Sequence, residues 1–157
     1  MNFWLMKSEP DEFSIDDLAR GPKKGSPWTG VRNYQARNFM RDHMQVGDGV
    51  LFYHSSCEVP GIAGIARVAR RAYPDATQFD RKSKYYDAAS KREAPRWTLV
   101  DIKALRKTRL VPLSELRAQP ALADMVVLRR ANRLSITPVT ASEWRYITTR
   151  LLAAPPA

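Results

Sequence analysis

Short apolar runs separated by polar or turn-forming residues dominate the pattern along the chain. Runs of this length that are rich in β-branched and aromatic residues are typical of strands, and clusters of Gly, Pro, Asp and Ser between them mark turns. Gly61 and Gly64 favour a bend, because glycine in a strand often marks a bulge or a close backbone approach. The runs that predict strands cover residues 2–6, 50–55, 62–73, 97–111 and 134–139.

Helix-start signals precede the segments between and after these runs. Ser14 is followed three positions later by Asp17, and Thr140 by Glu143, which is the spacing of a capping box. Asn33 is a third candidate for an N-cap residue. The helices predicted from these signals and from apolar spacing cover residues 15–20, 34–43, 113–117, 122–128 and 141–151.

Residues 77–95 show no clear period and carry Tyr85 and Tyr86 in an otherwise polar segment. A long connection of this kind inside a compact domain is usually functional. Short strands with helices between and after them predict an α+β domain with a curled, partly closed sheet. No P-loop or G-x-G-x-x-G pattern is present, so a doubly wound nucleotide-binding fold is not expected. We expect a single domain over residues 1–150 and a tail over residues 151–157.

The net charge of +10 adds a functional signal, because it is placed unevenly. Residues 1–60 carry 7 Lys/Arg and 8 Asp/Glu, whereas residues 61–157 carry 19 and 8. A basic field attracts polyanions, and nucleic acid is the commonest of them, although a solubilising surface is a plainer explanation. The residues that we expect to hold phosphates without reading sequence are Arg67, Arg70, Arg71, Arg81, Lys82, Lys84, Arg106, Lys107 and Arg109.

Several other kinds of chemistry are not indicated. Cys57 is the only cysteine, which excludes an intrachain disulfide and a four-cysteine zinc site. His54 lies beside Ser55, but neighbours along a strand point to opposite faces, so adjacency does not make a catalytic pair. No cluster has the spacing of metal ligands, and every apolar run is shorter than the roughly 20 residues that cross a bilayer. The sequence therefore predicts no metal, no cofactor, no membrane partner and a cytoplasmic, reducing location.

A set of polar and aromatic residues beside turns has no obvious role in forming helices or strands. Hydroxyl, carboxylate and amide groups can read the hydrogen-bonding edge of a base, and an indole offers a face for stacking. Trp28 lies in a Gly/Pro-rich loop, where core packing is hard to arrange, so we expect it to face a ligand. For the other residues of this set, purely structural roles stay open, as a helix cap, a turn carboxylate or a core residue. The set consists of Ser8, Glu9, Trp28, Asn33, Ser55, Trp97 and Ser135.

Seven segments in this order and spacing resemble the EVE domain family, including its thymocyte nuclear protein type. They are WLMKSEP, WTGVRNYQARNFM, GDGVLFYHS, PGIAGIARV, YPD, PRWTLVDI and RLSITPVTASEW. The resemblance runs from Phe3 to about Ile147, and Ile136 departs from it where many relatives have Val. It implies a PUA-like fold, which is a curled, partly closed β-barrel with flanking short helices. It also implies the reading of modified bases in DNA or RNA.

The resemblance further implies which residues line a base pocket. Arg133 and Leu134 belong to this set through the resemblance alone. The implied pocket residues are Lys7, Ser8, Glu9, Pro10, Trp28, Val31, Arg32, Asn33, His54, Ser55, Trp97, Arg133, Leu134 and Ser135.

Three functions are compatible with these residues. The favoured one is a non-catalytic reader of a methylated or hydroxymethylated base, which is held flipped or single-stranded between aromatic and polar groups. The second is a general RNA-binding module without a preference for modification. The third is an enzyme acting on a base or nucleotide with Glu9 or His54 as acid or base. The expected partner is DNA or RNA, and a monomer suffices to read one base.

Overall fold

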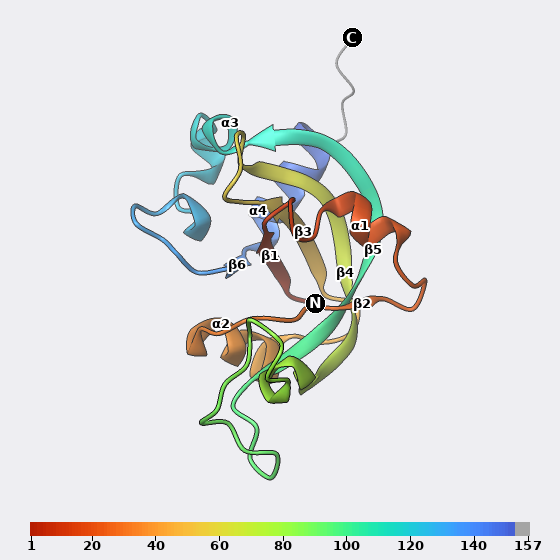
Figure 1. Ribbon diagram of the computed structural model, residues 1–157. Coiled ribbons are helices and arrows are strands. Elements are labelled where there is room, and N and C mark those ends of the chain that lie inside the picture. The colour runs from red at the N-terminus through yellow and green to blue at the C-terminus, as the bar shows by residue number, and fades with distance from the viewer. Residues whose placement is uncertain (153–157) are drawn as a thin grey trace.

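Six strands form one mixed sheet in the computed structural model, which describes residues 1–152. Across the sheet their order is β2-β5-β4-β3-β1-β6 (Figure 1). β1 and β3 are parallel, and the other neighbouring pairs are antiparallel. The sheet is not closed by hydrogen bonds, so the expected partly closed barrel is not confirmed. The strands are β1 (Phe3–Ser8), β2 (Ser26–Pro27), β3 (Gly49–His54), β4 (Gly61–Pro74), β5 (Thr98–Pro112) and β6 (Ile136–Val139).

The central strands β1 and β3 bury side chains on both faces of the sheet. Trp4 and Met6 pack into one apolar cluster, whereas Leu5 between them packs into a second. β3 divides in the same way, with Phe52 in the first cluster and Leu51 in the second. Successive side chains of a strand point to opposite faces, so apolar groups cover both sides. This explains why these strands are continuously apolar in sequence instead of alternating.

The helices are short, and two of them continue as π-helical turns over Phe39–His43 and Ile147–Leu151. Both predicted capping boxes are confirmed, at Ser14 and Thr140. The predicted helix over residues 122–128 is replaced by separate 3-10 turns at Pro120–Leu122 and Val126–Leu128. The α-helices are α1 (Ile15–Arg20), α2 (Tyr34–Asn38), α3 (Leu113–Arg117) and α4 (Ala141–Tyr146).

The two-residue strand β2 has no signal in the sequence, since it depends on a distant partner. Ser26 and Pro27 pair with β5, and the Trp28 N–H donates to the Val100 carbonyl oxygen at 2.9 Å. This pairing places Trp28 in the first apolar cluster with 7% of its surface exposed. Trp28 is therefore part of the core, which its position in a Gly/Pro-rich loop did not predict.

The connection from the 3-10 turn at Ala76–Phe79 to β5 has little regular structure, as expected. It lies beside α2 at one end of the sheet (Figure 1). The fully buried side chain of Gln78 organises it by donating to the Trp97 carbonyl oxygen at 2.8 Å and accepting from the Ser90 hydroxyl at 2.5 Å. A buried amide that bonds both ends of a loop fixes its course without a helix or strand.

The C-terminal part of the chain contributes to the second apolar cluster. Leu151 and Leu152 are buried there, although both fall within the expected tail. The remainder of that tail, residues 153–157, lies outside the described residues.

Gly61 allows two backbones to approach closely at the start of β4. A Cβ atom at Gly61 would lie 2.3 Å from the Val111 carbonyl oxygen, and the β4–β5 register shifts just beyond it, between Ile62 and Gly64. We therefore expect Gly61→Ala to lower the free energy of unfolding by about 1–3 kcal/mol in urea titrations, the usual cost of overpacking. Gly21→Ala is the matched control, since the new Cβ would meet only the rotatable Ser26 hydroxyl within 3.0 Å. Equal losses in the two variants would contradict this account.

Candidate functional site

A cavity of about 490 Å³ lies where β1 and β3 end against the segment of residues 28–32, and we call it the main cavity. Its walls also include the turn after β1, the loop carrying Tyr85 and the segment before β6. The lining residues are Lys7, Ser8, Glu9, Glu12, Trp28, Thr29, Gly30, Val31, Arg32, Ser55, Ser56, Tyr85, Arg133 and Ser135.

The structure brings together most, but not all, of the implied pocket residues. Those that line the main cavity are Lys7, Ser8, Glu9, Trp28, Val31, Arg32, Ser55, Arg133 and Ser135. Those that do not are Pro10, Asn33, His54, Trp97 and Leu134. Pro10 lies in the turn between β1 and α1, and Leu134 lies just before β6.

Asn33 and Trp97 have structural partners of their own. The Asn33 side-chain oxygen caps α2 by accepting from the Ala36 N–H at 3.0 Å. The Trp97 indole N–H donates to Asp87 at 2.8 Å, and its ring stacks on Tyr34 with centroids 4.8 Å apart. Trp97 therefore fixes the loop, and its ring does not form part of the cavity wall.

His54 positions helix α1. Its Nε2 atom accepts a hydrogen bond from the Ile15 N–H at 3.1 Å, so the ring nitrogen that faces α1 is unprotonated. Burial lowers the pKa of His54 from its ordinary value, opposed by the nearby Asp16 carboxylate and reinforced by Lys107. The structure thus uses His54 as a backbone acceptor next to the cavity.

Asp75 and Arg32 form the polar centre that holds one cavity wall. Asp75 is fully buried, and one of its oxygens accepts from the Gly30 N–H at 2.9 Å and from Arg32 Nη1 at 3.2 Å. The other oxygen accepts from the Thr77 N–H at 2.9 Å and the Thr77 hydroxyl at 2.6 Å. Arg32 also donates to the Tyr85 carbonyl oxygen through Nε at 3.1 Å and Nη2 at 2.8 Å. The Asp75 carboxylate therefore joins the turn after β4 to the segment of residues 28–32, and Arg32 extends the connection to Tyr85.

Gly30 is the residue over which the Tyr85 ring lies. A Cβ atom there would come within 2.5 Å of Tyr85 Cζ, and Gly30 has a φ of +85° that side chains rarely adopt. Only glycine meets both requirements without displacing the ring. The ring of Tyr85 is thereby held against the backbone of the cavity wall.

Two donors in the main cavity have no protein acceptor among residues 1–152. The Trp28 indole N–H makes no hydrogen bond there, in contrast to the indoles of Trp4 and Trp97. Lys7 is half-buried, and no described carboxylate lies within ion-pair distance of it. Burial lowers the pKa of Lys7, as expected for an ammonium group without a counter-ion. The cavity therefore offers a free indole N–H to a ligand, and Lys7, whose ammonium lies 5.9 Å from the Tyr53 ring centroid, adds a cation without a carboxylate partner.

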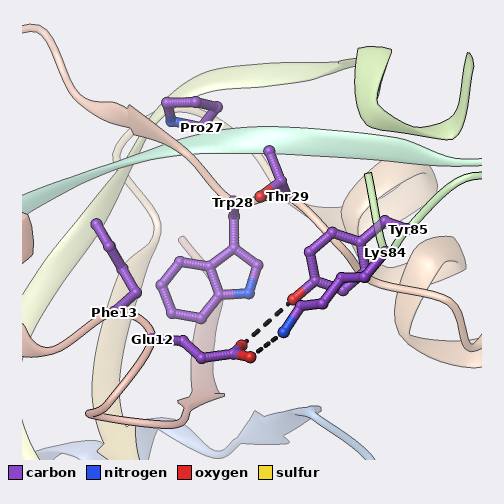
Figure 2. Close-up of a pocket in the computed structure, with 7 residues that line it drawn as sticks. All are labelled: Glu12, Phe13, Pro27, Trp28, Thr29, Lys84 and Tyr85. Atoms are coloured by element: carbon purple, nitrogen blue, oxygen red, sulfur yellow. Dashed lines mark hydrogen bonds and ion pairs between the residues drawn. The ribbon is translucent and has the colours of Figure 1, made fainter. Parts of the chain in front are cut away.

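Glu12 bridges the cavity rim from the turn before α1. Its carboxylate forms an ion pair with Lys84 and accepts from the Tyr85 hydroxyl at 3.3 Å (Figure 2). The Lys84 and Glu12 side chains are 61% and 43% exposed, so their ion pair contributes little to stability. The rim contact can therefore break when a ligand offers a better partner.

The basic residues expected to bind phosphate are all exposed, on β4, on β5 and in the loop between them. Three of them already have acidic partners: Lys84 with Glu12, Lys107 with Asp16 at 3.0 Å, and Arg109 with Glu115 at 2.5 Å. Arg70 lies over the Tyr73 ring at 3.8 Å. The Tyr73 hydroxyl in turn donates to Asp101, and burial together with this bond raises the pKa of Tyr73 to about 12.

Five lining residues were missed by sequence reasoning. Tyr85 carried a signal, since it is an aromatic residue in a long connection without periodicity. The others are small or acidic residues in turns and had no distinguishing signal. The missed residues are Glu12, Thr29, Gly30, Ser56 and Tyr85.

Two classes of feature are not found in residues 1–152. No group of three or more His, Cys, Asp or Glu side chains is arranged to hold a metal ion there. No helix in this range has the length and apolarity needed to cross a bilayer.

Comparisons with known proteins agree on one family. The family model described as EVE domain matches residues 2–150. Thymocyte nuclear protein 1 of Gallus gallus is 43% identical over 92% of this chain, and the chain spans 66% of that protein's length. A solved structure of a Pseudomonas syringae protein is 47% identical, with a TM-score of 0.88 over 93% of this chain and 97% of that one. The human THYN1 protein, solved in complex with 5-methylcytosine-containing DNA, is 42% identical, with a TM-score of 0.88 over 94% of this chain and 95% of that one.

These names correct the expected location. Relatives from Gallus gallus and Homo sapiens bear the name thymocyte nuclear protein 1, so the expectation of a cytoplasmic location is wrong. A lone cysteine excludes an intrachain disulfide, and it does not distinguish the cytoplasm from the nucleus, where thiols are also kept reduced.

We expect Asp75→Asn to lower the free energy of unfolding by about 2–4 kcal/mol in urea titrations. The substitution removes the charge opposite Arg32, and either orientation of the amide turns its NH₂ group toward a backbone N–H, of Gly30 or of Thr77. Asp80→Asn is the matched control, because the exposed Asp80 carboxylate accepts only from the Lys82 N–H among residues 1–152. A change below about 0.5 kcal/mol in Asp75→Asn would contradict a central role for this carboxylate.

His54 should make stability depend on pH. Its pKa is lowered in the folded state, so the unfolded chain, with a pKa near about 6.5, binds the proton more readily. The free energy of unfolding should therefore fall as the pH drops through and below that value, from about pH 7.5 to 5.5. His54→Gln keeps a hydrogen-bond acceptor and should flatten this dependence in unfolding titrations, whereas His43→Gln, at an exposed position, should leave it unchanged. An unaltered pH profile in His54→Gln would show that the effect has another source.

Proposed function

Because this chain belongs to the EVE domain family, we propose that it binds nucleic acid and reads a modified base in the main cavity. The observation that carries the proposal is the human THYN1 protein in complex with 5-methylcytosine-containing DNA, which shares 42% identity and a TM-score of 0.88 with this chain. The modification is a methyl or hydroxymethyl group, and the base is single-stranded or flipped out of a duplex.

The main cavity has the chemistry that a base requires. Tyr85 and Trp28 supply aromatic surface, and the hydroxyl groups of Ser55 and Ser135 make no hydrogen bond within residues 1–152. These hydroxyls can donate to or accept from the edge of a base. At about 490 Å³ the cavity lies within the usual range for small-molecule sites, about 300–1,000 Å³.

The exposed basic residues of β4, β5 and the intervening loop hold the phosphates in this proposal. Contacts of this kind supply affinity that depends on salt and carries no sequence information. Lys84 and Lys107 exchange their exposed carboxylate partners for phosphate, since such surface ion pairs are weak. A monomer is sufficient for this arrangement, because one chain supplies both the cavity and the basic residues.

The role that we propose is non-catalytic. The ring nitrogen of His54 that faces α1 already accepts the Ile15 N–H, so it is not free to take a proton from a ligand. Glu9, the other residue considered as acid or base, lines the main cavity but has no side-chain partner within residues 1–152 that would orient it for proton transfer. The second candidate is a general nucleic-acid binder without a preference for modification, and the nine exposed basic residues favour it.

Trp28→Phe separates these two functions. The variant keeps an aromatic ring in the apolar cluster but removes the unpartnered indole N–H and part of the cavity wall. We expect wild-type protein to bind a 5-methylcytosine oligonucleotide at least tenfold more tightly than the unmodified one, a difference of about 1.4 kcal/mol. In Trp28→Phe this ratio should fall toward one, while salt-dependent binding to the unmodified oligonucleotide persists. Fluorescence anisotropy titrations at two salt concentrations measure both quantities.

Arg71→Gln is the control for phosphate binding, since Arg71 is exposed on β4 and does not line the main cavity. It should weaken binding to both oligonucleotides equally and leave their ratio unchanged. If wild-type protein binds all oligonucleotides equally, including those with 5-hydroxymethylcytosine or N6-methyladenine, the general binder is the correct description.

A further inference from the structure

A second cavity of about 380 Å³ adjoins the main cavity, and we call it the flanking cavity (Figure 2). The two cavities share Glu12, Trp28, Thr29 and Tyr85, so a single layer of side chains separates them. Phe13 lines only the flanking cavity. A ligand that extends beyond the main cavity on this side meets the flanking cavity next.

Three of the residues that line the flanking cavity are aromatic: Phe13, Trp28 and Tyr85. Phe13 and Tyr85 lie on opposite sides of the Trp28 indole (Figure 2). Phe13 meets Trp28 edge-on, at a ring-centroid distance of 6.4 Å and an interplanar angle of 87°. Aromatic side chains of this kind bind any nucleobase through its π-face, which makes them tolerant of sequence.

The polar residues that line the flanking cavity are Glu12, Thr29 and Lys84. There the Glu12 carboxylate contacts the Lys84 ammonium group and the Tyr85 hydroxyl. Lys84 is exposed and also lies 5.1 Å from the Tyr85 ring centroid. Lys84 lines the flanking cavity and is paired with Glu12, which both cavities share, so its cation is available to the phosphate between two consecutive nucleotides.

We propose that the flanking cavity binds the base of the nucleotide next to the modified one, so that the protein recognises a two-nucleotide unit. The proposal rests on the proposed function, in which the main cavity holds the modified base. On binding, Lys84 leaves Glu12 and pairs with the phosphate that joins the two nucleotides. The freed Glu12 carboxylate then accepts a hydrogen bond from an exocyclic amino group of either base.

An abasic series tests this site in the wild-type protein. Single-stranded oligonucleotides carry one 5-methylcytosine and an abasic site at the 5′ neighbour, at the 3′ neighbour or five positions away. We expect the abasic site on one side to lower affinity at least tenfold, about 1.4 kcal/mol. The distant abasic site should change affinity less than twofold. Losses below twofold at both neighbours, or equal losses at all three positions, would overturn the proposal.

Phe13→Leu and Phe13→Tyr assign the effect to the flanking cavity. Leucine keeps an apolar contact with the core but removes the ring, so the one-sided abasic penalty should shrink to less than threefold. Tyrosine keeps the ring and should retain the penalty, and thermal unfolding checks that both variants are folded. An undiminished penalty in folded Phe13→Leu would assign the flanking base to another surface and overturn the proposal.

The same series keeps the two proposals apart. Repeating it with unmodified cytosine measures the flanking site alone. A one-sided, Phe13-dependent penalty without a preference for 5-methylcytosine would support the flanking cavity and reject the reading of a modified base. A preference for 5-methylcytosine without any penalty at the neighbours would support the reading of a modified base and reject the flanking cavity as a base-binding site.

Discussion

The buried carboxylate of Asp75 is the interaction on which the candidate site depends. An ionised group without solvent contact is costly unless each of its oxygens is hydrogen-bonded, and Asp75 meets this condition with Gly30, Arg32 and Thr77. Its partners come from the segment after β2 and from the turn after β4, and Arg32 extends the connection to Tyr85. Segments that are far apart in the chain are thereby brought into one cavity wall.

The interactions that hold the wall of the main cavity are more firmly fixed than those at its rim. Asp75 and Arg32 interact in a mostly buried setting, with the side chain of Arg32 22% exposed, whereas the Glu12–Lys84 pair at the rim is open to water. Buried charge-assisted bonds resist rearrangement, and exposed ones are screened and readily exchanged. The geometry that would recognise a flat ring is therefore fixed, while the charges around the opening can adapt to the backbone of a nucleic acid.

The features that sequence reasoning predicted correctly are local ones. The capping boxes at Ser14 and Thr140 depend on side chains three residues apart, and the apolar runs of β1 and β3 report burial on both faces. The missed features join distant residues. Arg32 and Asp75 are 43 positions apart, and β2 exists only through β5. The core packing of Trp28 was missed for the same reason, because local Gly and Pro content gives no information on a partner strand.

The position of Trp97 explains why Tyr85 matters to this site. Two tryptophans suggested two stacking faces, but Trp97 is occupied by Asp87 and Tyr34, which leaves Trp28 and Tyr85 as the rings of the main cavity. Trp28 is fixed by the core, and Tyr85 is fixed by Arg32 and by its contact with Gly30. Neither ring needs to be ordered when a ligand arrives, so little conformational entropy is lost on binding. Selectivity for one modified base would then follow from the rigidity of two rings that different parts of the fold hold in place.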